Sequence, residues 1–74
     1  MLVRVLLTVP GTLVHEPLLW DLNRTFPVVT NLRGTSISAS VALVALDLVG
    51  EADKIQEAID HLRARGVKVE VSAE

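Results

Sequence analysis

The length, composition and charge of the chain limit what it can be. A chain of 74 residues forms one domain, residues 1–74, and buries only roughly 60% of the surface that it exposes when unfolded. It contains no cysteine, which excludes a disulfide framework and a thiolate metal site. The net charge of -2 argues against a nucleic-acid groove, because such a groove needs concentrated lysine and arginine.

The chain is nevertheless rich in apolar residues. Hydrophobic residues make up 50% of it and the mean hydropathy is +0.46, so we expect part of the apolar surface to lie in a subunit interface. The first apolar run contains Arg4 and ends at Pro10, which is typical of a strand and not of a signal peptide. The run from Val41 to Val49 falls short of the roughly 20 residues that a membrane span requires. These patterns favour a cytoplasmic protein without membrane insertion.

Residues 2–26 are predicted to form a strand followed by a helix. Leu2 to Val9 is aliphatic on both alternating faces, as expected of a central strand, and Pro10-Gly11 ends it. The helix begins near residues 15–17, where Pro17 is tolerated and Glu16 meets the positive end of the helix dipole. Four residues at helical spacing form its buried stripe, namely Leu18, Leu19, Leu22 and Phe26.

The next two segments, Val28 to Ile37 and Ala39 to Val49, are predicted to form a long hairpin. Arg33-Gly34 indicates either a bulge or a close backbone approach in the first of these strands. In the second strand, alternation divides the side chains between two faces. Val44, Leu46 and Leu48 face the core, and Leu43, Ala45 and Asp47 lie on the opposite face.

A second helix and a last strand complete the predicted elements. The helix follows Gly50, and its apolar residues recur at i, i+3, i+4 and i+7: Ile55, Ala58, Ile59 and Leu62. Gly66 supplies its C-terminal stop. Val67 to Val71 then alternates, with its three valines facing inward and Lys68 and Glu70 facing outward.

The resulting order β-α-β-β-α-β predicts an α+β fold, the ferredoxin-like sandwich. Right-handed crossovers place the strands in the order 4-1-3-2, as a four-stranded antiparallel sheet with both helices on one face. An RNA-recognition domain shares this topology but carries aromatic residues on its sheet for base stacking. Trp20 and Phe26 instead lie on the first helix, so we exclude that function.

No catalytic or metal-binding pattern accompanies this fold. His61 lies on a charged helix face, where we expect it to be solvated, and His15 has only Glu16 beside it. The hydroxyl residues of the strands have no paired base that would activate them as nucleophiles. The acidic residues of the second helix are expected to form a solvated face: Glu51, Asp53, Glu57 and Asp60. We therefore predict a protein that is not an enzyme and that holds no cofactor and no metal.

Five segments resemble the NIL domain, a small ferredoxin-like module found at the C-terminus of methionine-importer ATPases and beside bacterial ferredoxins. They are Val9-Pro10-Gly11, Glu16-Pro17-Leu18, Thr30-Asn31-Leu32-Arg33-Gly34, Leu46-Asp47-Leu48-Val49-Gly50 and residues 62–71. The resemblance covers almost the whole chain. The sequence departs from the family in two places: the family's Asn-Ile-Leu falls on Thr30, Asn31 and Leu32, and the glycine usual in the next turn is absent from residues 36–40.

The resemblance implies a regulatory domain that binds methionine and inhibits transport when this amino acid accumulates. We therefore expect a homodimeric sensor of a small sulfur amino acid, methionine in particular. Because the chain carries no ATPase, the domain would act on a separate partner or sense alone. One alternative is a protein-interaction module for a transporter or a sulfur-metabolism enzyme, with no ligand of its own. Another is an ACT-type amino-acid regulator.

A ligand is expected where the first strand meets the first helix. The N-terminus of that helix offers unpaired N–H groups and a positive dipole to a carboxylate. The expected binding residues there are Pro10, Gly11, Thr12, His15 and Glu16, and Thr30, Asn31 and Leu32 of a neighbouring subunit are expected to receive the side chain. Gly11→Val is expected to abolish binding while the fold stays intact.

The dimer is expected to form along the second strand. Strands two and four are the edges of the predicted sheet, and an exposed edge is normally protected by charged residues. Strand four carries Lys68 and Glu70, whereas strand two carries only Arg33. The alternative seam is the open face of the sheet, where an apolar patch lies beside Arg4 and Asp47; the patch consists of Leu6, Leu43 and Ala45.

Overall fold

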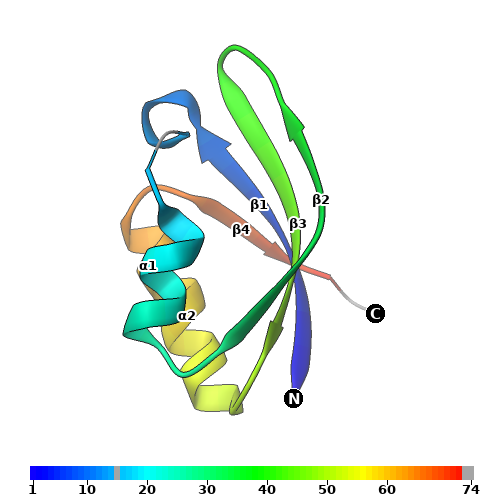
Figure 1. Ribbon diagram of the computed structural model, residues 1–74, viewed down its shortest axis with the longest axis vertical. Helices are drawn as coiled ribbons and strands as arrows, with labels where there is room; N and C mark the ends of the chain where they lie inside the picture. Colours follow the sequence, from blue (N-terminus) through cyan, green and yellow to red (C-terminus); the bar gives the residue numbers. More distant parts are fainter. Residues whose placement is uncertain (15, 73–74) are drawn as a thin grey trace.

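Figure 1 shows two layers, a four-stranded sheet and two helices that cover one of its faces. The structure, a computed structural model, describes residues 1–14 and 16–72. Its elements are, in chain order, β1 (Leu2–Pro10), the 3-10 helix η1 (Gly11–Leu13), α1 (Leu18–Thr25), β2 (Val29–Ile37), β3 (Val41–Val49), α2 (Ala52–Ala64) and β4 (Lys68–Val71). The strand order β2-β3-β1-β4 is the predicted order read from the other edge, and the ferredoxin-like α+β fold is confirmed.

β1 lies in the centre of the sheet, as its apolar faces predicted. It pairs antiparallel with β3 along its whole length, from Leu2 opposite Val49 to Pro10 opposite Val41. On its other side it pairs antiparallel with the short strand β4. Val5, Leu7 and Val9 are buried beneath the helices and form the inward face of this strand.

α1 is shorter than the segment that the sequence predicts. It begins at Leu18 with Pro17 as its N-cap, because a residue that precedes a proline is disfavoured in the helical region. It ends before Phe26, which is extended at φ -122° and ψ 143° and is itself followed by Pro27. Leu18 and Leu22 are buried, whereas Leu19 and Phe26 are only partly buried against the core.

The hairpin follows the prediction closely. Its two strands are β2 and β3, and the turn is closed by the Ser38 N–H, which donates to the Val41 oxygen at 2.9 Å. The pairing register shifts between Leu32 and Gly34, which leaves Arg33 as the extra residue of the predicted bulge.

α2 and β4 confirm the predicted helix and correct one residue of the predicted strand. Gly66 has φ 98° and ends the helix, and the Val67 N–H donates to the Leu62 oxygen at 3.0 Å. Val69 is buried, but Val71 is 53% exposed. It shares the predicted inward face with its neighbour Val5, but it is the last residue of an edge strand and stays exposed; the strand itself begins at Lys68, one residue later than predicted.

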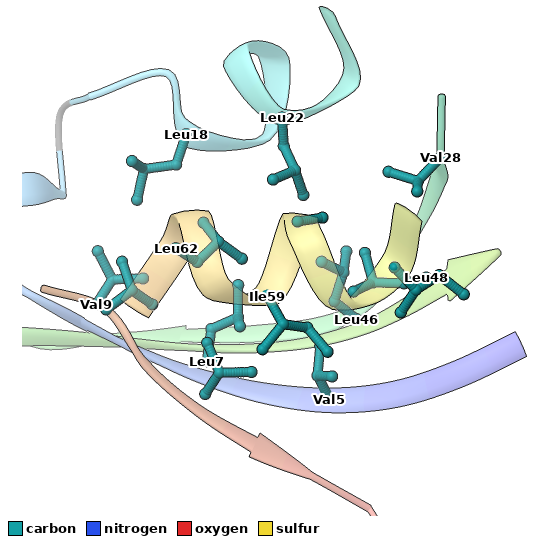
Figure 2. Packing of buried hydrophobic residues seen from close by; sticks show 14 of the residues in the cluster. Val5, Leu7, Val9, Leu18, Leu22, Val28, Leu46, Leu48, Ile59 and Leu62 are labelled. Atoms are coloured by element: carbon teal, nitrogen blue, oxygen red, sulfur yellow. The ribbon is translucent and has the colours of Figure 1, made fainter. Parts of the chain in front are cut away.

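The core lies between the sheet and the two helices. Figure 2 shows Leu22 of α1 and Ile59 and Leu62 of α2 pointing towards the side chains of β1 and β3. All four predicted stripe residues of α2 are buried. His61 is not simply solvated as expected, because its partly buried ring packs edge-on against Phe26 with 5.4 Å between the centroids.

Candidate functional site

An apolar pocket of about 280 Å³ lies between the start of α1 and the hairpin end of the sheet. Its floor is formed by the ends of β1 and β3, and its sides by residues 13–14, by residues 16–20 and by β2. Most of the lining is aliphatic, and Glu16 and Thr35 supply two of its few polar side chains. Its volume lies just below the range of about 300–1,000 Å³ that is usual for ligand pockets. The pocket is therefore suited to one small, mainly apolar group.

The β2 edge forms an exposed side of the pocket. Thr35 and Ile37 line it, and they pair with Val44 and Ala42 of β3, which line it as well. Ile37 lies at the end of an edge strand and is exposed. A group that approached along this edge would therefore reach the pocket without passing through the core.

Trp20 and Glu16 border the pocket on the α1 side. Trp20 is 56% exposed, and the Arg24 guanidinium lies 4.5 Å from the centre of its ring, in cation–π geometry. Glu16 Oε1 accepts a hydrogen bond from Arg65 Nη2 at 2.7 Å, and Arg65 Nη1 lies 3.9 Å from Asp21 Oδ2. These contacts fix the start of α1 against the C-terminus of α2.

Pro10, Gly11 and Thr12 lie in sequence between the pocket residues Val9 and Leu13, and Gly11 has a structural role. The Gly11 N–H donates to the Ser40 oxygen at 2.9 Å, and a Cβ at Gly11 would lie 3.0 Å from the same oxygen. A side chain at Gly11 would therefore crowd the contact between β1 and the hairpin turn, and the expectation that Gly11→Val leaves the fold intact stays a prediction. Pro10 ends β1 and Thr12 lies in η1, directly before the pocket residue Leu13.

Of the other loop residues predicted to bind the ligand, Glu16 lines the pocket. His15 lies outside the described residues. The role of these residues in binding stays a prediction.

Three other predicted residues lie near the N-terminal end of β2, away from the end that lines the pocket. They are Thr30, Asn31 and Leu32. They pair with Leu48, Asp47 and Leu46, and the Thr30 hydroxyl accepts a hydrogen bond from Asn23 Nδ2 at 3.0 Å. The structure therefore does not bring them together with the loop residues of the same subunit. Their expected contribution from a neighbouring subunit remains a prediction.

Sequence reasoning missed the residues of β2 and α1 that line the pocket. Thr35 and Ile37 follow Arg33-Gly34 on alternate positions, so carrying the strand alternation past the predicted bulge would have placed both on the helix-covered face. The position of Trp20 beside the helix stripe was a second signal.

Across the part of the chain that the structure describes, no group of three His, Cys, Asp or Glu residues could hold a metal ion. None of the described helices has the length and apolar character needed to cross a membrane.

The strand order, the two helices on one face and the pocket beside α1 define a small ferredoxin-like α+β domain. More particularly, the chain belongs to the NIL domain family, because the family model matches residues 3–71. A search of curated proteins found no match.

Two of the similar solved structures illustrate the fold. One is the C-terminal domain of an ABC transporter ATP-binding protein from Enterococcus faecalis, with a TM-score of 0.85 and 24% identity over 97% of this chain and 84% of that one. The other is a de novo designed protein, Foldit4, with a TM-score of 0.61 and 12% identity over 99% of this chain and 96% of that one.

Proposed function

We propose that this NIL domain is a regulatory domain that binds a small sulfur amino acid, methionine in particular, and does not catalyse a reaction. The observation that carries the proposal is the apolar pocket between α1 and the end of the hairpin. A methionine side chain is unbranched and polarizable, so it can fill an irregular aliphatic pocket of this size. The similarity to a domain of an ABC transporter ATP-binding protein supports a transporter as the regulated partner.

The polar end of the amino acid would lie at the rim of the pocket. Glu16 is the acidic side chain there and would attract the ammonium group, although it is already hydrogen-bonded to Arg65 at 2.7 Å. The N–H groups of the first turn of α1 lack partners within the helix and suit the carboxylate. Pro10, Gly11, Thr12 and the adjoining His15 are proposed to shape this rim.

A homodimer along β2 would complete the site. In an antiparallel pair of β2 strands centred near the bulge, Thr30 to Leu32 of the partner would lie beside Thr35 to Ile37, which border the pocket. Charge on the two edges favours this seam, because Lys68 and Glu70 pair at 3.6 Å on β4 while β2 carries only Arg33. We therefore place the binding site at the junction of two subunits.

A thermal-shift screen against the twenty amino acids tests the proposal. Methionine at about a hundred times its dissociation constant should add about 2.7 kcal/mol to the free energy of unfolding. Trp20 is the one tryptophan of the chain and lines the pocket, so its fluorescence should change in the same titration. The absence of both signals for every amino acid would contradict ligand binding.

A matched pair of variants assigns the signal to the pocket. Thr35→Phe places a ring on an exposed strand position that borders the pocket, so it should abolish the shift. Ser36→Phe adds the same ring one residue later, on the opposite face of the sheet, and should leave the shift intact. An equal shift in both variants would place the ligand elsewhere.

A second candidate is a protein-interaction module for a transporter or a sulfur-metabolism enzyme, without a ligand. The same likeness to the Enterococcus faecalis domain favours it. It predicts that no amino acid alters the melting temperature, so the screen separates the two functions.

A further inference from the structure

The open face of the sheet, which is the face opposite the helices, carries three rows of side chains. The strand register places Leu2, Val49 and Val29 in one row, then Arg4, Asp47 and Asn31, and then Leu6, Ala45 and Gly34. Leu2, Leu6 and Val49 are all exposed, and Leu43 follows on the same face. An apolar surface of this kind with a polar centre is typical of an interaction site.

Asp47 lies at the centre of this face and is only 5% exposed. Its Oδ1 atom makes no hydrogen bond within the described part of the chain. Arg4 Nε at 3.6 Å and Arg33 Nη1 at 3.9 Å are close enough for charge attraction but too distant for hydrogen bonds. A buried carboxylate oxygen without a donor is costly, so a donor from outside the subunit would stabilise it.

The arrangement of charges on this face is complementary to itself. β1 and β3 are the two central strands, and Arg4 lies directly opposite Asp47. A two-fold axis parallel to the strands and between β1 and β3 would place each Arg4 over the partner's Asp47. The same rotation would place β4 over the partner's β2, with Glu70 near the partner's Arg33, because Glu70 and Gly34 share one row.

We propose that the open face binds a second copy of this chain, with the two sheets packed face to face. Leu2 would then lie over the partner's Val49 and Leu6 over the partner's Ala45, as in the aligned packing of two sheets about 10 Å apart. Arg4 donates to Asp47 Oδ1 of the opposite subunit. This interface is distinct from the β2 seam, which leaves the open face uncovered, so a chain that uses both seams assembles beyond a dimer.

The experiment begins from a chain in which the β2 edge is blocked by Thr30→Pro. On this background, Arg4→Glu and Asp47→Lys are each expected to be monomeric by light scattering, whereas an equimolar mixture of the two is expected to form heterodimers by native mass spectrometry. Mixing restores opposite charges between subunits but leaves the two like charges within each chain unchanged. The mixture therefore tests the intermolecular contact alone.

Three results would overturn the proposal. The first is a blocked chain that is monomeric at about 100 μM, a concentration at which a dimer of micromolar affinity would form. The second is a mixture of the two variants that stays monomeric, and the third is a single variant that remains dimeric. Should Asp47→Lys fail to fold, Leu6→Glu replaces it, because Leu6 is 40% exposed and its substitution should dissociate the blocked chain. Val71→Glu, on the other face, is its control and should leave the dimer intact.

Discussion

At the scale of single residues, the close approach of Gly11 to the hairpin turn decides which side chains its position accepts. The turn oxygen of Ser40 accepts the Gly11 N–H and would lie 3.0 Å from any added Cβ. Gly34 differs, because a Cβ there would have no neighbour within 4 Å. The two glycines therefore form a natural comparison between a crowded and an open position.

We predict that Gly11→Ala lowers the free energy of unfolding by about 1–3 kcal/mol, because the turn must shift to admit the methyl group. Gly34→Ala should leave stability unchanged or raise it by about 0.4–1 kcal/mol, since it restricts the unfolded chain without a clash. Urea unfolding of both variants measures the difference. Equal stabilities would show that the turn moves without cost.

At the scale of elements, α2 is a scaffold and β2 is the proposed interface. α2 buries four apolar side chains on the sheet and exposes its acidic residues, which is the pattern predicted from its sequence. β2 has a protected side facing β3 and a second side without a neighbouring strand in the described sheet. Changes in these two elements should therefore affect different properties of the protein.

We predict that Ile59→Ala destabilises the fold by about 2–5 kcal/mol, because Ile59 is fully enclosed between α2 and β1 and its truncation leaves a cavity. Glu57→Ala is the control on the exposed side of the same helix. It removes an ion pair with Lys54 at 3.4 Å and should cost less than about 1 kcal/mol. A stable, cooperative Ile59→Ala protein in chemical denaturation would show that the site collapses around the missing atoms.

We predict that Thr30→Pro shifts the β2-paired dimer towards smaller species. The backbone hydrogen bonds of successive β3 residues point alternately to β2 and to β1. The Val41 oxygen accepts from the Ser38 N–H on the β2 side, whereas the Gly50 N–H donates to the Met1 oxygen on the β1 side. Thr30, opposite Leu48, therefore directs its N–H away from β3, and proline removes that donor at a position that an edge strand tolerates.

Thr30→Val is the matched control for this prediction. It keeps the N–H and loses only the hydroxyl that accepts from Asn23, so its mass in light scattering should equal that of the unmodified chain. Masses that do not differ between the proline and valine variants would remove β2 from the assembly.

At the scale of the whole molecule, the sequence predicted which side chains share a face of a helix or strand. It did not predict how far each side chain on a face would be buried by its neighbours. The spacing of Ile55 and Ile59 and the alternation of β1 identified the core faces, because helix and strand periods fix which residues lie together. Alternation also placed Asp47 away from the helices, but it could not show that Arg4 and Arg33 would enclose it. Likewise, Val71 has the inward orientation that alternation predicts, and its exposure depends on where the strand ends.

The pocket was only half predictable for a related reason. Glu16 could be placed at the start of the first helix from Pro17 alone. The wall formed by Thr35 and Ile37 depends on how far the hairpin extends past α1, which is a property of the assembled layers. The local sequence pattern therefore does not predict how far the hairpin extends past α1.

We predict that the melting temperature rises with protein concentration, because assembly stabilises the folded subunits by mass action. A tenfold increase in concentration corresponds to about 1.4 kcal/mol per dimer, or about 3–6 °C for a domain of this size. Differential scanning calorimetry at several concentrations measures the shift. A melting temperature that is independent of concentration would contradict both proposed interfaces.

The central position of β1 has a consequence for how the chain folds. β1 pairs with β4 through residues as distant in sequence as Thr8 and Lys68, so the sheet closes only after the ends of the chain meet. Contacts of such high sequence separation carry a large loop-closure cost and slow the search for the native state. Until β4 docks, the first strand presents a bare, aliphatic edge to other nascent chains. β1 therefore stabilises the core of the folded protein but promotes aggregation of the partly folded chain.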